Sequence, residues 1–367
     1  MSHAGASVLY KSPLHKMTQT SPTCLWNDSA AISELTYSIE HGAVGATCNP
    51  VIALSVLKAE MHDWKDRIRG LIGREMPTAT EDQIGWRVIE EMSVKGAKLL
   101  EPIFEEHRGR NGRLSIQTDP RNYRNTEAIL EQATRFSQLA PNMIVKIPVT
   151  LAGIPAIEEA TYRGISINAT VSFSLPQCLA VGDAVERGLC RREREGKEIA
   201  TMGPVCTIMV GRLDDWLKVV MEKENICVDP GYLEWAGVAV FKKAYSIFQE
   251  RGYRLRLLSA AFRNHMHWSE FIGGDVVISP PCGWQKRYNA SDIEVVPRIG
   301  KPVDGHIVDE LLRKFDDFRR AWSEDGLRPD EFDSFAPTVR TLRQFNAACT
   351  DLAVLVRDSM LPNPDVK

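Results

Sequence analysis

The chain has 367 residues, of which 44% are hydrophobic and 25% are charged, the balance of an ordinary globular protein. Its formal net charge of −3 gives no reason to expect binding to nucleic acid or to an anionic membrane surface. No apolar run approaches the roughly 18 residues that a membrane-spanning helix needs. We therefore expect no nucleic-acid partner and no membrane partner.

The first 22 residues lack the hydrophobic region of a secretory signal, so we expect 1–22 to form an N-terminal arm, either loose or covering the fold. The eight cysteines are scattered and form no CxxC pair. Such spacing suits reduced thiols better than a disulfide framework or a zinc cluster, which predicts a cytoplasmic protein.

Eight short runs rich in Val, Ile, Leu and Thr recur along the chain. They are nearly continuous in apolar character, which is typical of strands covered on both faces. The predicted strands are 23–28, 45–49, 113–118, 143–148, 166–171, 205–210, 254–261 and 275–280.

Amphipathic segments with a 3.6-residue period lie between these runs and predict helices. The clearest helical segments are 31–42, 81–107, 126–140 and 230–252.

Eight strand–helix units in series predict an α/β fold, a closed (β/α)8 TIM barrel over 23–305, in preference to an open doubly wound sheet. No GxGxxG follows the first strand, which weakens a dinucleotide-binding interpretation. Residues 306–367 carry only helical patterns, so we expect a helical extension packed on the barrel. The charged segment 186–203 is predicted to be a solvated loop or a helix end.

Polar residues stand near the end of every predicted strand, which is where enzymes with this fold carry their active sites. Lys146 is unusual because it interrupts the run MIVKIP, and a buried ammonium costs several kcal/mol unless it is paired or loses its proton. The polar residues are Asp28, Thr47, Asn49, Gln117, Lys146, Asn168, Thr170, Thr207, Arg212, Arg263 and Ser279.

Each of these residues also has an ordinary structural explanation. An Asp or Asn at a strand end commonly caps a turn or a helix, and a Thr within a strand is a good β-former. Lys146 could lay its stem along the barrel wall and send its head to solvent. Arg212, in GRLDDW, could form a surface ion pair.

A catalytic interpretation explains more of them together. Desolvation and nearby cations lower the pKa of a lysine inside a barrel, and a neutral amine forms a Schiff base with a carbonyl carbon. The protonated imine then serves as an electron sink for breaking or forming the adjacent C–C bond. Asp28 is the candidate for moving protons, while Arg212 and Arg263 would grip a terminal phosphate.

Five motifs occur in order from about Cys24 to Pro280, namely ATCNP, MIVKIPVTLAGIPAIEEATYRGISINATVSFS, IMVGRLDDW, SAAFRN and VVISP. In this combination the chain resembles the transaldolase family. The resemblance implies a (β/α)8 barrel that uses no metal and no organic cofactor. It also implies sugar phosphate substrates and transfer of a dihydroxyacetone unit from a ketose phosphate to an aldose phosphate.

Carried over residue by residue, the resemblance implies that Lys146 is the Schiff-base lysine and that Asp28 shuttles a proton. Gln117 and Thr170 would complete the catalytic set around the water. Substrate contacts would come from Thr47, Asn49, Asn168, Thr207, Arg212 and Arg263.

Three departures from the family pattern bear on the reaction. Gln117 stands where the family usually has a catalytic glutamate, and an amide can hold a water but cannot take its proton. Gln at this place also occurs in the fructose-6-phosphate aldolase branch, although Met209 stands where that branch uses a tyrosine. Ala261 replaces a serine that helps to bind phosphate. Simple aldol cleavage is therefore an alternative to transfer.

Two further alternatives stay open. His265 and His267, in HMHW, could belong to a metal-dependent aldolase, but a metal site would want a third ligand. With Gln117 and Ala261 the chain could also be a catalytically weakened paralogue that only binds a sugar phosphate, although retention of the lysine argues against this. The long helices leave room for a homodimer.

Overall fold

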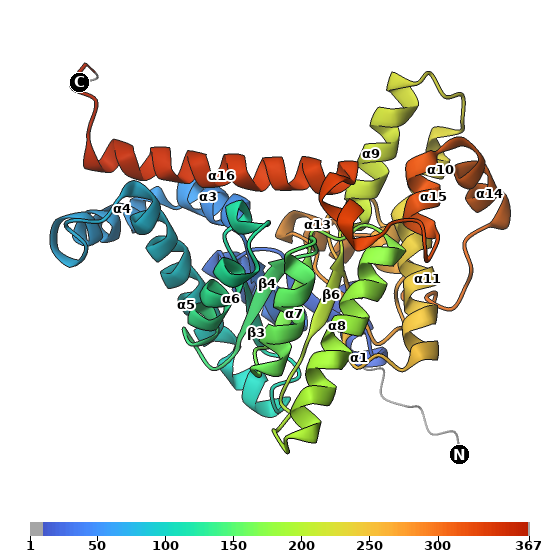
Figure 1. Ribbon diagram of the computed structural model, residues 1–367, viewed down its shortest axis with the longest axis horizontal. Coiled ribbons are helices and arrows are strands. Elements are labelled where there is room, and N and C mark those ends of the chain that lie inside the picture. The colour runs from blue at the N-terminus through green and yellow to red at the C-terminus, as the bar shows by residue number, and fades with distance from the viewer. Residues whose placement is uncertain (1–9, 366–367) are drawn as a thin grey trace, which may run out of the picture.

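The computed structural model describes residues 10–365 and has the predicted (β/α)8 barrel (Figure 1). The strands are parallel and follow one another around the barrel in chain order, and β8 closes onto β1 through the pairs Cys24–Val277 and Leu25–Ile278. Each strand overlaps its predicted run. The strands are β1 (Cys24–Asn27), β2 (Ala43–Cys48), β3 (Arg113–Gln117), β4 (Met143–Pro148), β5 (Ile167–Thr170), β6 (Val205–Ile208), β7 (Arg256–Ser259) and β8 (Val277–Ile278).

The helices surround the strands and extend beyond them. Up to the sixth strand they are α1 (Pro13–Thr20), α2 (Ile32–Glu40), α3 (Pro50–Ala59), α4 (Met61–Gly70), η1 (Leu71–Glu75), α5 (Glu81–Glu106), η2 (Pro120–Asn122), α6 (Thr126–Ser137), α7 (Gly153–Tyr162) and α8 (Leu175–Arg194). After it they are α9 (Val210–Lys223), α10 (Pro230–Leu233), α11 (Ala236–Arg251), α12 (Met266–Ser269), α13 (Cys282–Asn289), α14 (Gly305–Lys314), α15 (Asp316–Trp322), η3 (Pro329–Ser334) and α16 (Ala336–Met360).

One predicted helix differs in detail from the structure. The helix expected over 230–252 is divided into α10 and α11, with a break at Glu234 and Trp235. The charged segment 186–203, predicted to be a loop or a helix end, contains both, because it begins as the last turns of α8, which ends at Arg194, and continues as a loop.

The described part of the N-terminal arm covers the fold and is not loose. Helix α1 packs against β1 and α13, and its Leu14 and Met17 side chains are fully buried. Residues 1–9 of the predicted arm lie outside the described residues.

The barrel interior has an apolar floor. Trp26, Ile144, Val205, Leu258 and Val277, from five different strands, form a cluster separate from the core between strands and helices. Successive side chains of a strand point to opposite faces, so residues two positions further along point into the barrel as well. Those residues include Asp28, Lys146, Thr207 and Ser279. A polar layer therefore lies above the apolar floor, toward the carboxyl ends of the strands.

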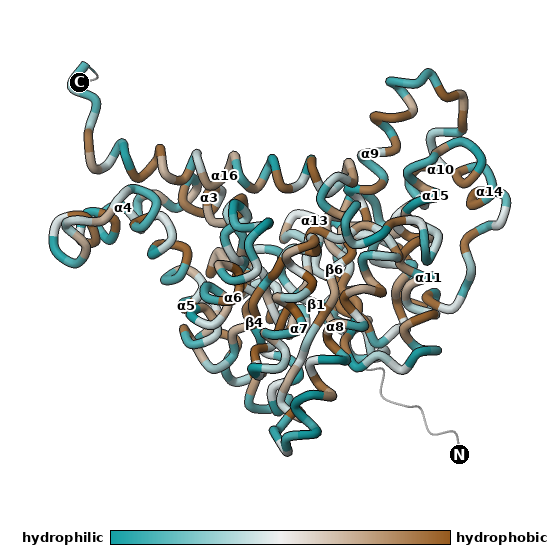
Figure 2. Tube along the Cα trace, viewed as in Figure 1, coloured by the Kyte–Doolittle hydropathy of each residue, from teal (hydrophilic) through white to brown (hydrophobic). Residues whose placement is uncertain are grey.

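Helix α16 crosses the mouth of the barrel, the opening at the carboxyl ends of the strands, above that polar layer. It packs against α3, η2 and α9, which directly follow the carboxyl ends of β2, β3 and β6 (Figure 1). Near its start, Nε2 of Gln177 donates to Oγ1 of Thr338 over 3.4 Å. Figure 2 shows α16 alternating between hydrophobic and hydrophilic residues, as an amphipathic helix with one buried face does. The helical extension is thus part of the wall around the mouth.

Within residues 10–365, no helix is long and apolar enough to cross a bilayer. Each of the eight cysteines is a free thiol.

The tight contact between Gly45 and the floor makes a stability prediction. A Cβ on Gly45 would come within 2.5 Å of the Trp26 indole. We expect Gly45→Ala to lower the free energy of unfolding by about 1–3 kcal/mol, the usual cost of overpacking a core. Guanidinium-induced unfolding would measure the loss.

The matched control is Gly283→Ala in α13, where an added Cβ would meet nothing within 4 Å. Alanine is favoured over glycine in a helix by up to about 1 kcal/mol, so this variant should be neutral or more stable. Equal losses in both variants would contradict the packing described for the floor.

Candidate active site

Lys146 lies at the centre of the polar layer. Its strand pairs it with Gln117 of β3 on one side and Asn168 of β5 on the other. The side chain is only 4% exposed, and burial lowers the pKa of its amine, although the negative charge of Asp28 opposes that shift. A larger fraction of the amine is therefore neutral, and nucleophilic, near neutral pH than for an ordinary lysine.

Asp28 is the carboxylate whose negative charge acts on this amine. It follows β1, and Oγ1 of Thr47 donates a hydrogen bond to its Oδ1 over 2.5 Å. This bond fixes the orientation of the carboxylate and occupies one of its two oxygens. The other oxygen is left to accept or return a proton.

Asn168 is tied to the barrel wall by its neighbours. Its Nδ2 donates to Oγ of Ser115 over 3.0 Å, and its Oδ1 accepts from Oγ1 of Thr207 over 2.7 Å. All three residues are buried. The chain of bonds connects β3, β5 and β6 beneath the mouth and leaves one N–H of the amide for a ligand.

Three buried polar atoms around Lys146 have no hydrogen-bond partner within the described residues. They are Oε1 of Gln117, Oγ1 of Thr170 and Oγ of Ser279. An unsatisfied buried polar group costs about 1–3 kcal/mol, so such atoms are retained where a ligand or a water completes them. Together they provide the polar layer with hydrogen-bonding positions that a polyhydroxylated substrate could fill.

Arg212 lies in the first turn of α9. Burial, together with the positive charge of Arg263, lowers the pKa of its guanidinium to about 10. The ring of Phe345, from α16, lies 5.8 Å from the guanidinium carbon. Nε of Arg212 is also buried without a partner among the described residues, which leaves a donor for an anion.

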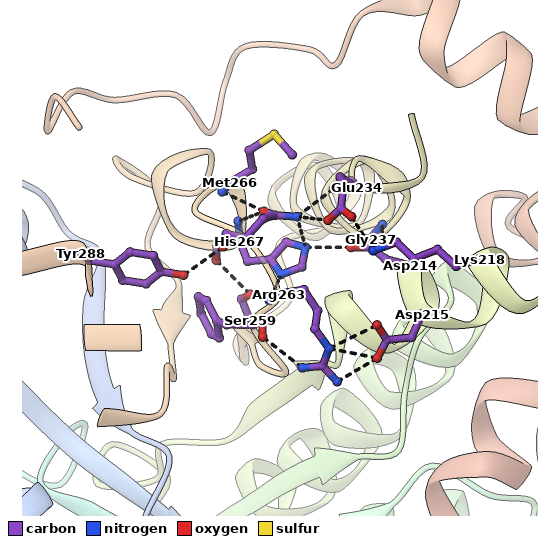
Figure 3. A network of polar contacts seen from close by, with 12 residues as sticks. Asp214, Asp215, Lys218, Glu234, Gly237, Ser259, Arg263, Met266, His267 and Tyr288 are labelled. Carbon is purple, nitrogen blue, oxygen red and sulfur yellow. Dashed lines mark hydrogen bonds and ion pairs between the residues drawn. The ribbon is translucent and has the colours of Figure 1, made fainter. Parts of the chain in front are cut away.

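Arg263 lies on the segment after β7 and is paired with Asp215 (Figure 3). Its Nη2 is 2.8 Å from Oδ2 of Asp215, and its Nε lies 3.0 Å from the same oxygen. The structural explanation from the sequence was that Arg212 of GRLDDW forms a surface ion pair. The ion pair of this motif is instead formed by Asp215, with Arg263.

Asn49 caps a helix, as the ordinary explanation predicts. It is the N-cap of α3, and its Oδ1 accepts from the backbone N–H of Ile52 over 2.9 Å. The amide nitrogen is then left for a substrate contact, and Oδ1 can accept one further bond.

The two histidines of HMHW do not extend into a metal site. His267 is fully buried, with Nε2 2.8 Å from Oδ2 of Asp214 and Nδ1 3.0 Å from the backbone nitrogen of Arg263. Across residues 10–365 there is no group of three or more His, Cys, Asp or Glu side chains placed to hold a metal ion. The geometry therefore gives the metal-dependent hypothesis no third ligand.

Sequence reasoning missed the contribution of α16 to the mouth. Besides Phe345, the helix supplies Thr341, which is buried one turn earlier and whose Oγ1 has no partner among the described residues. An amphipathic period predicts the helix and its buried face but not the surface that the face covers. Sequence reasoning also missed Ser115, which accepts from Asn168, because it resembles an ordinary strand residue.

The chain is similar to proteins of known family. The model of the transaldolase/fructose-6-phosphate aldolase family matches residues 25–322. The transaldolase of Thermobifida fusca is 35% identical over 178 residues, which are 48% of this chain and 47% of that protein. The transaldolase of Kocuria rhizophila is 30% identical over 209 residues, 56% of each chain. The Streptomyces avermitilis protein named transaldolase 1 is 32% identical over 210 residues, 56% of this chain and 54% of its own.

Two facts limit the extent of that similarity. The chain spans about half the length of the curated relatives it matches. Helix α16, which crosses the mouth, follows the end of the family match at residue 322.

The buried amine makes a prediction about stability and pH. The pKa of Lys146 is lowered by folding, so below its ordinary value the unfolded chain binds a proton more readily than the native protein. We expect Lys146→Met to unfold at a higher temperature than the wild type at neutral pH, by about 1 °C for each kcal/mol of the penalty in a chain of this length.

The difference should shrink as the pH rises toward 10, since the unfolded lysine then also loses its proton. Thermal unfolding followed by circular dichroism from pH 6 to pH 10 measures it. Lys58→Met, at an exposed position of α3, is the control and should show no such pH-dependent gap. A variant less stable than the wild type at every pH would contradict the burial penalty.

Proposed function

Because this chain belongs to the transaldolase/fructose-6-phosphate aldolase family, we propose that it is a transaldolase-type transferase that forms a Schiff base between Lys146 and a ketose phosphate and transfers a dihydroxyacetone unit to an aldehyde acceptor. The observation that carries the proposal is the buried amine of Lys146, whose pKa burial lowers, with Asp28 as the nearby carboxylate. The relatives with the printed name transaldolase support the same reaction class.

The proposed steps use groups that this chain supplies. Nζ of Lys146 attacks the ketose carbonyl carbon, and loss of water gives a protonated imine. Asp28 takes the proton from the hydroxyl two carbons away from the imine carbon. The bond between the two carbons beyond the imine breaks, its electron pair moves toward the imine nitrogen to give an enamine, and the first aldehyde leaves.

The second half of the reaction runs in the opposite direction. The enamine carbon attacks the acceptor aldehyde, and Asp28 returns its proton to the new alkoxide. Water then adds to the imine, and the C–N bond breaks to release the product ketose and the free amine. Gln117 and Thr170 would orient that water with the two buried oxygens that have no partner among the described residues. Thr47 would hold Asp28, and Asn49, Asn168 and Thr207 would line the hydroxyl-binding side.

The anionic end of the sugar phosphate would lie at Arg212 and Arg263. The positive charges of the two guanidiniums repel each other, and a phosphate dianion bound between them would offset that repulsion. Asp215 holds Arg263 at present, so phosphate binding would require Arg263 to share or exchange that partner.

Simple aldol cleavage is the second candidate reaction, and Gln117 is the observation that favours it. Gln also occurs at this place in the fructose-6-phosphate aldolase branch, whereas the family usually has a catalytic glutamate there. Both reactions need the same Schiff base. They differ in whether product appears only when an acceptor aldehyde is added.

Assembly and location stay predictions. Helix α16 exposes Val339 and Val354 at 38% and 39% on its outer side, which is compatible with the predicted homodimer. Light scattering at micromolar concentration tests that assembly. The predicted cytoplasmic location is tested by fractionation of the source cells.

Trapping with borohydride tests the Schiff base directly. Wild-type protein is mixed with fructose 6-phosphate, and then with other ketoses, before reduction and measurement of the intact mass. We expect a single adduct of dihydroxyacetone mass on the wild type and on Lys58→Met, and none on Lys146→Met. If no ketose gives an adduct, the lysine mechanism is wrong and the sugar-phosphate-binding paralogue becomes the better hypothesis.

The phosphate subsite makes a separate prediction. Arg212→Met removes charge-assisted hydrogen bonds worth about 1.5–3 kcal/mol, so KM for a phosphorylated ketose should rise by roughly 10–100-fold. Trapping of unphosphorylated dihydroxyacetone, at saturating concentration, should be unchanged. Equal losses with both substrates would mean that Arg212 acts on Lys146 and not on phosphate.

A further inference from the structure

The proposed mechanism does not use the hydrogen-bonded pair formed by His267 and Asp214. Both side chains are fully buried, and the bond between Nε2 of His267 and Oδ2 of Asp214 is 2.8 Å long. Leaving a buried polar group of such a pair without its partner costs about 1–3 kcal/mol, and more where the group is charged. The pair joins Asp214 of α9, the helix that also carries Arg212, to the segment that carries Arg263, and Figure 3 shows His267 beside Arg263 and Asp214.

The hydrogen bonds define the tautomer of His267. The backbone N–H of Arg263 points at Nδ1 over 3.0 Å, and a backbone N–H can only donate. Nδ1 is therefore the acceptor, and the ring carries its proton on Nε2, from which it donates to Asp214. Asp214 in turn accepts from the backbone N–H of Gly237 over 2.8 Å, which anchors the carboxylate to α11.

Helix α9 thus holds the Arg263 segment at two points. Asp214 holds the backbone of Arg263 through His267, and Asp215 holds its guanidinium directly. Arg212 lies two residues before Asp214 on the same helix. The position of one arginine relative to the other is consequently fixed by two adjacent aspartates.

The backbone between the two arginines is packed closely enough to need such support. A Cβ on Gly211 would come within 2.1 Å of the carbonyl oxygen of Ala261 and within 3.1 Å of Cε1 of His267. Ala261 itself has φ +64°, in the left-handed region, which costs a non-glycine residue about 1–2 kcal/mol. A strained turn of this kind persists only where its surroundings hold it.

We infer that His267, oriented by Asp214, is a positioning residue that sets the place of Arg263 opposite Arg212 and so determines the affinity of the site for a phosphate group. This inference rests on the proposed function for its biological meaning, since the phosphate is the end of the substrate. The physical claim concerns phosphate binding alone and does not require the lysine chemistry.

Two substitutions of His267 separate its two hydrogen bonds. In His267→Asn, the Oδ1 atom can take the place of Nδ1, so the acceptor for Arg263 is kept and the contact with Asp214 is lost. In His267→Gln, the Nε2 atom can take the place of the ring Nε2, so the donor to Asp214 is kept and the acceptor for Arg263 is lost. Both variants remove the ring, so general loss of packing affects them alike.

Calorimetric titration with inorganic phosphate is the first readout. We expect His267→Gln to weaken phosphate binding by about tenfold, the effect of about one lost charge-assisted bond, and His267→Asn by less than about threefold. Asp214→Asn should behave like His267→Gln. The backbone N–H of Gly237 keeps the amide oxygen of the new Asn, so its NH2 group faces Nε2 of His267. That contact favours the opposite tautomer, whose Nδ1–H would face the N–H of Arg263. Reductive trapping of dihydroxyacetone on Lys146 should be unchanged in all three variants.

A measurement on the wild type covers the case in which the variants do not fold. Nitrogen NMR of protein labelled at histidine should show His267 with a protonated Nε2 and an unprotonated Nδ1, and phosphate should shift the Nδ1 signal. A protonated Nδ1, equal weakening by the Asn and Gln variants, or no phosphate binding by the wild type would each overturn the inference. If the wild type binds phosphate but gives no trapped adduct, the proposed lysine chemistry is wrong and the role of His267 is unaffected.

Discussion

The rest of the structure depends on one amine held away from water at the centre of a closed barrel. The barrel is closed, so no strand has a free edge, and every second side chain of each strand points into the interior. The floor of Trp26, Ile144 and Val205 places fully buried apolar side chains below the polar layer, so the next inward residues along these strands do not face solvent from below. Lys146 is one of these, and its low exposure is a consequence of the floor as much as of the mouth.

The polar residues around the amine divide into two groups by the way in which their bonding is satisfied. Asn168, Thr47 and Asp28 are engaged with the wall or with each other, and they act as rigid parts of the site. Gln117 and Thr170 instead keep buried oxygens that no described residue satisfies. A site of this composition is preorganised on one side and incomplete on the other, which is what a substrate with several hydroxyl groups requires.

Much of the barrel could be predicted from the sequence because strands buried on both faces leave a continuous apolar pattern, and Lys146 is conspicuous within such a run. The relation between Arg263 and Asp215 could not be predicted, because the two residues are 48 positions apart and only the parallel pairing of β6 with β7 brings them together. His267 looked like half of a metal site for the same reason, since its partner Asp214 lies on another element. Asn49 shows the opposite case, in which a local rule predicted the cap without any knowledge of the fold.

Helix α16 gives the site an unusual dependence on the order of synthesis. A chain that emerges from the ribosome with its N-terminal part first can close the barrel once β8 is available, at Ile278. The mouth is still uncovered then, because the helix that packs across it begins only at Ala336. A barrel that closed before this helix was made would leave the lysine at its centre open from above. The segments that close the barrel and the segment that covers its site are therefore different parts of the chain, and the covering segment is the last of them to be synthesised.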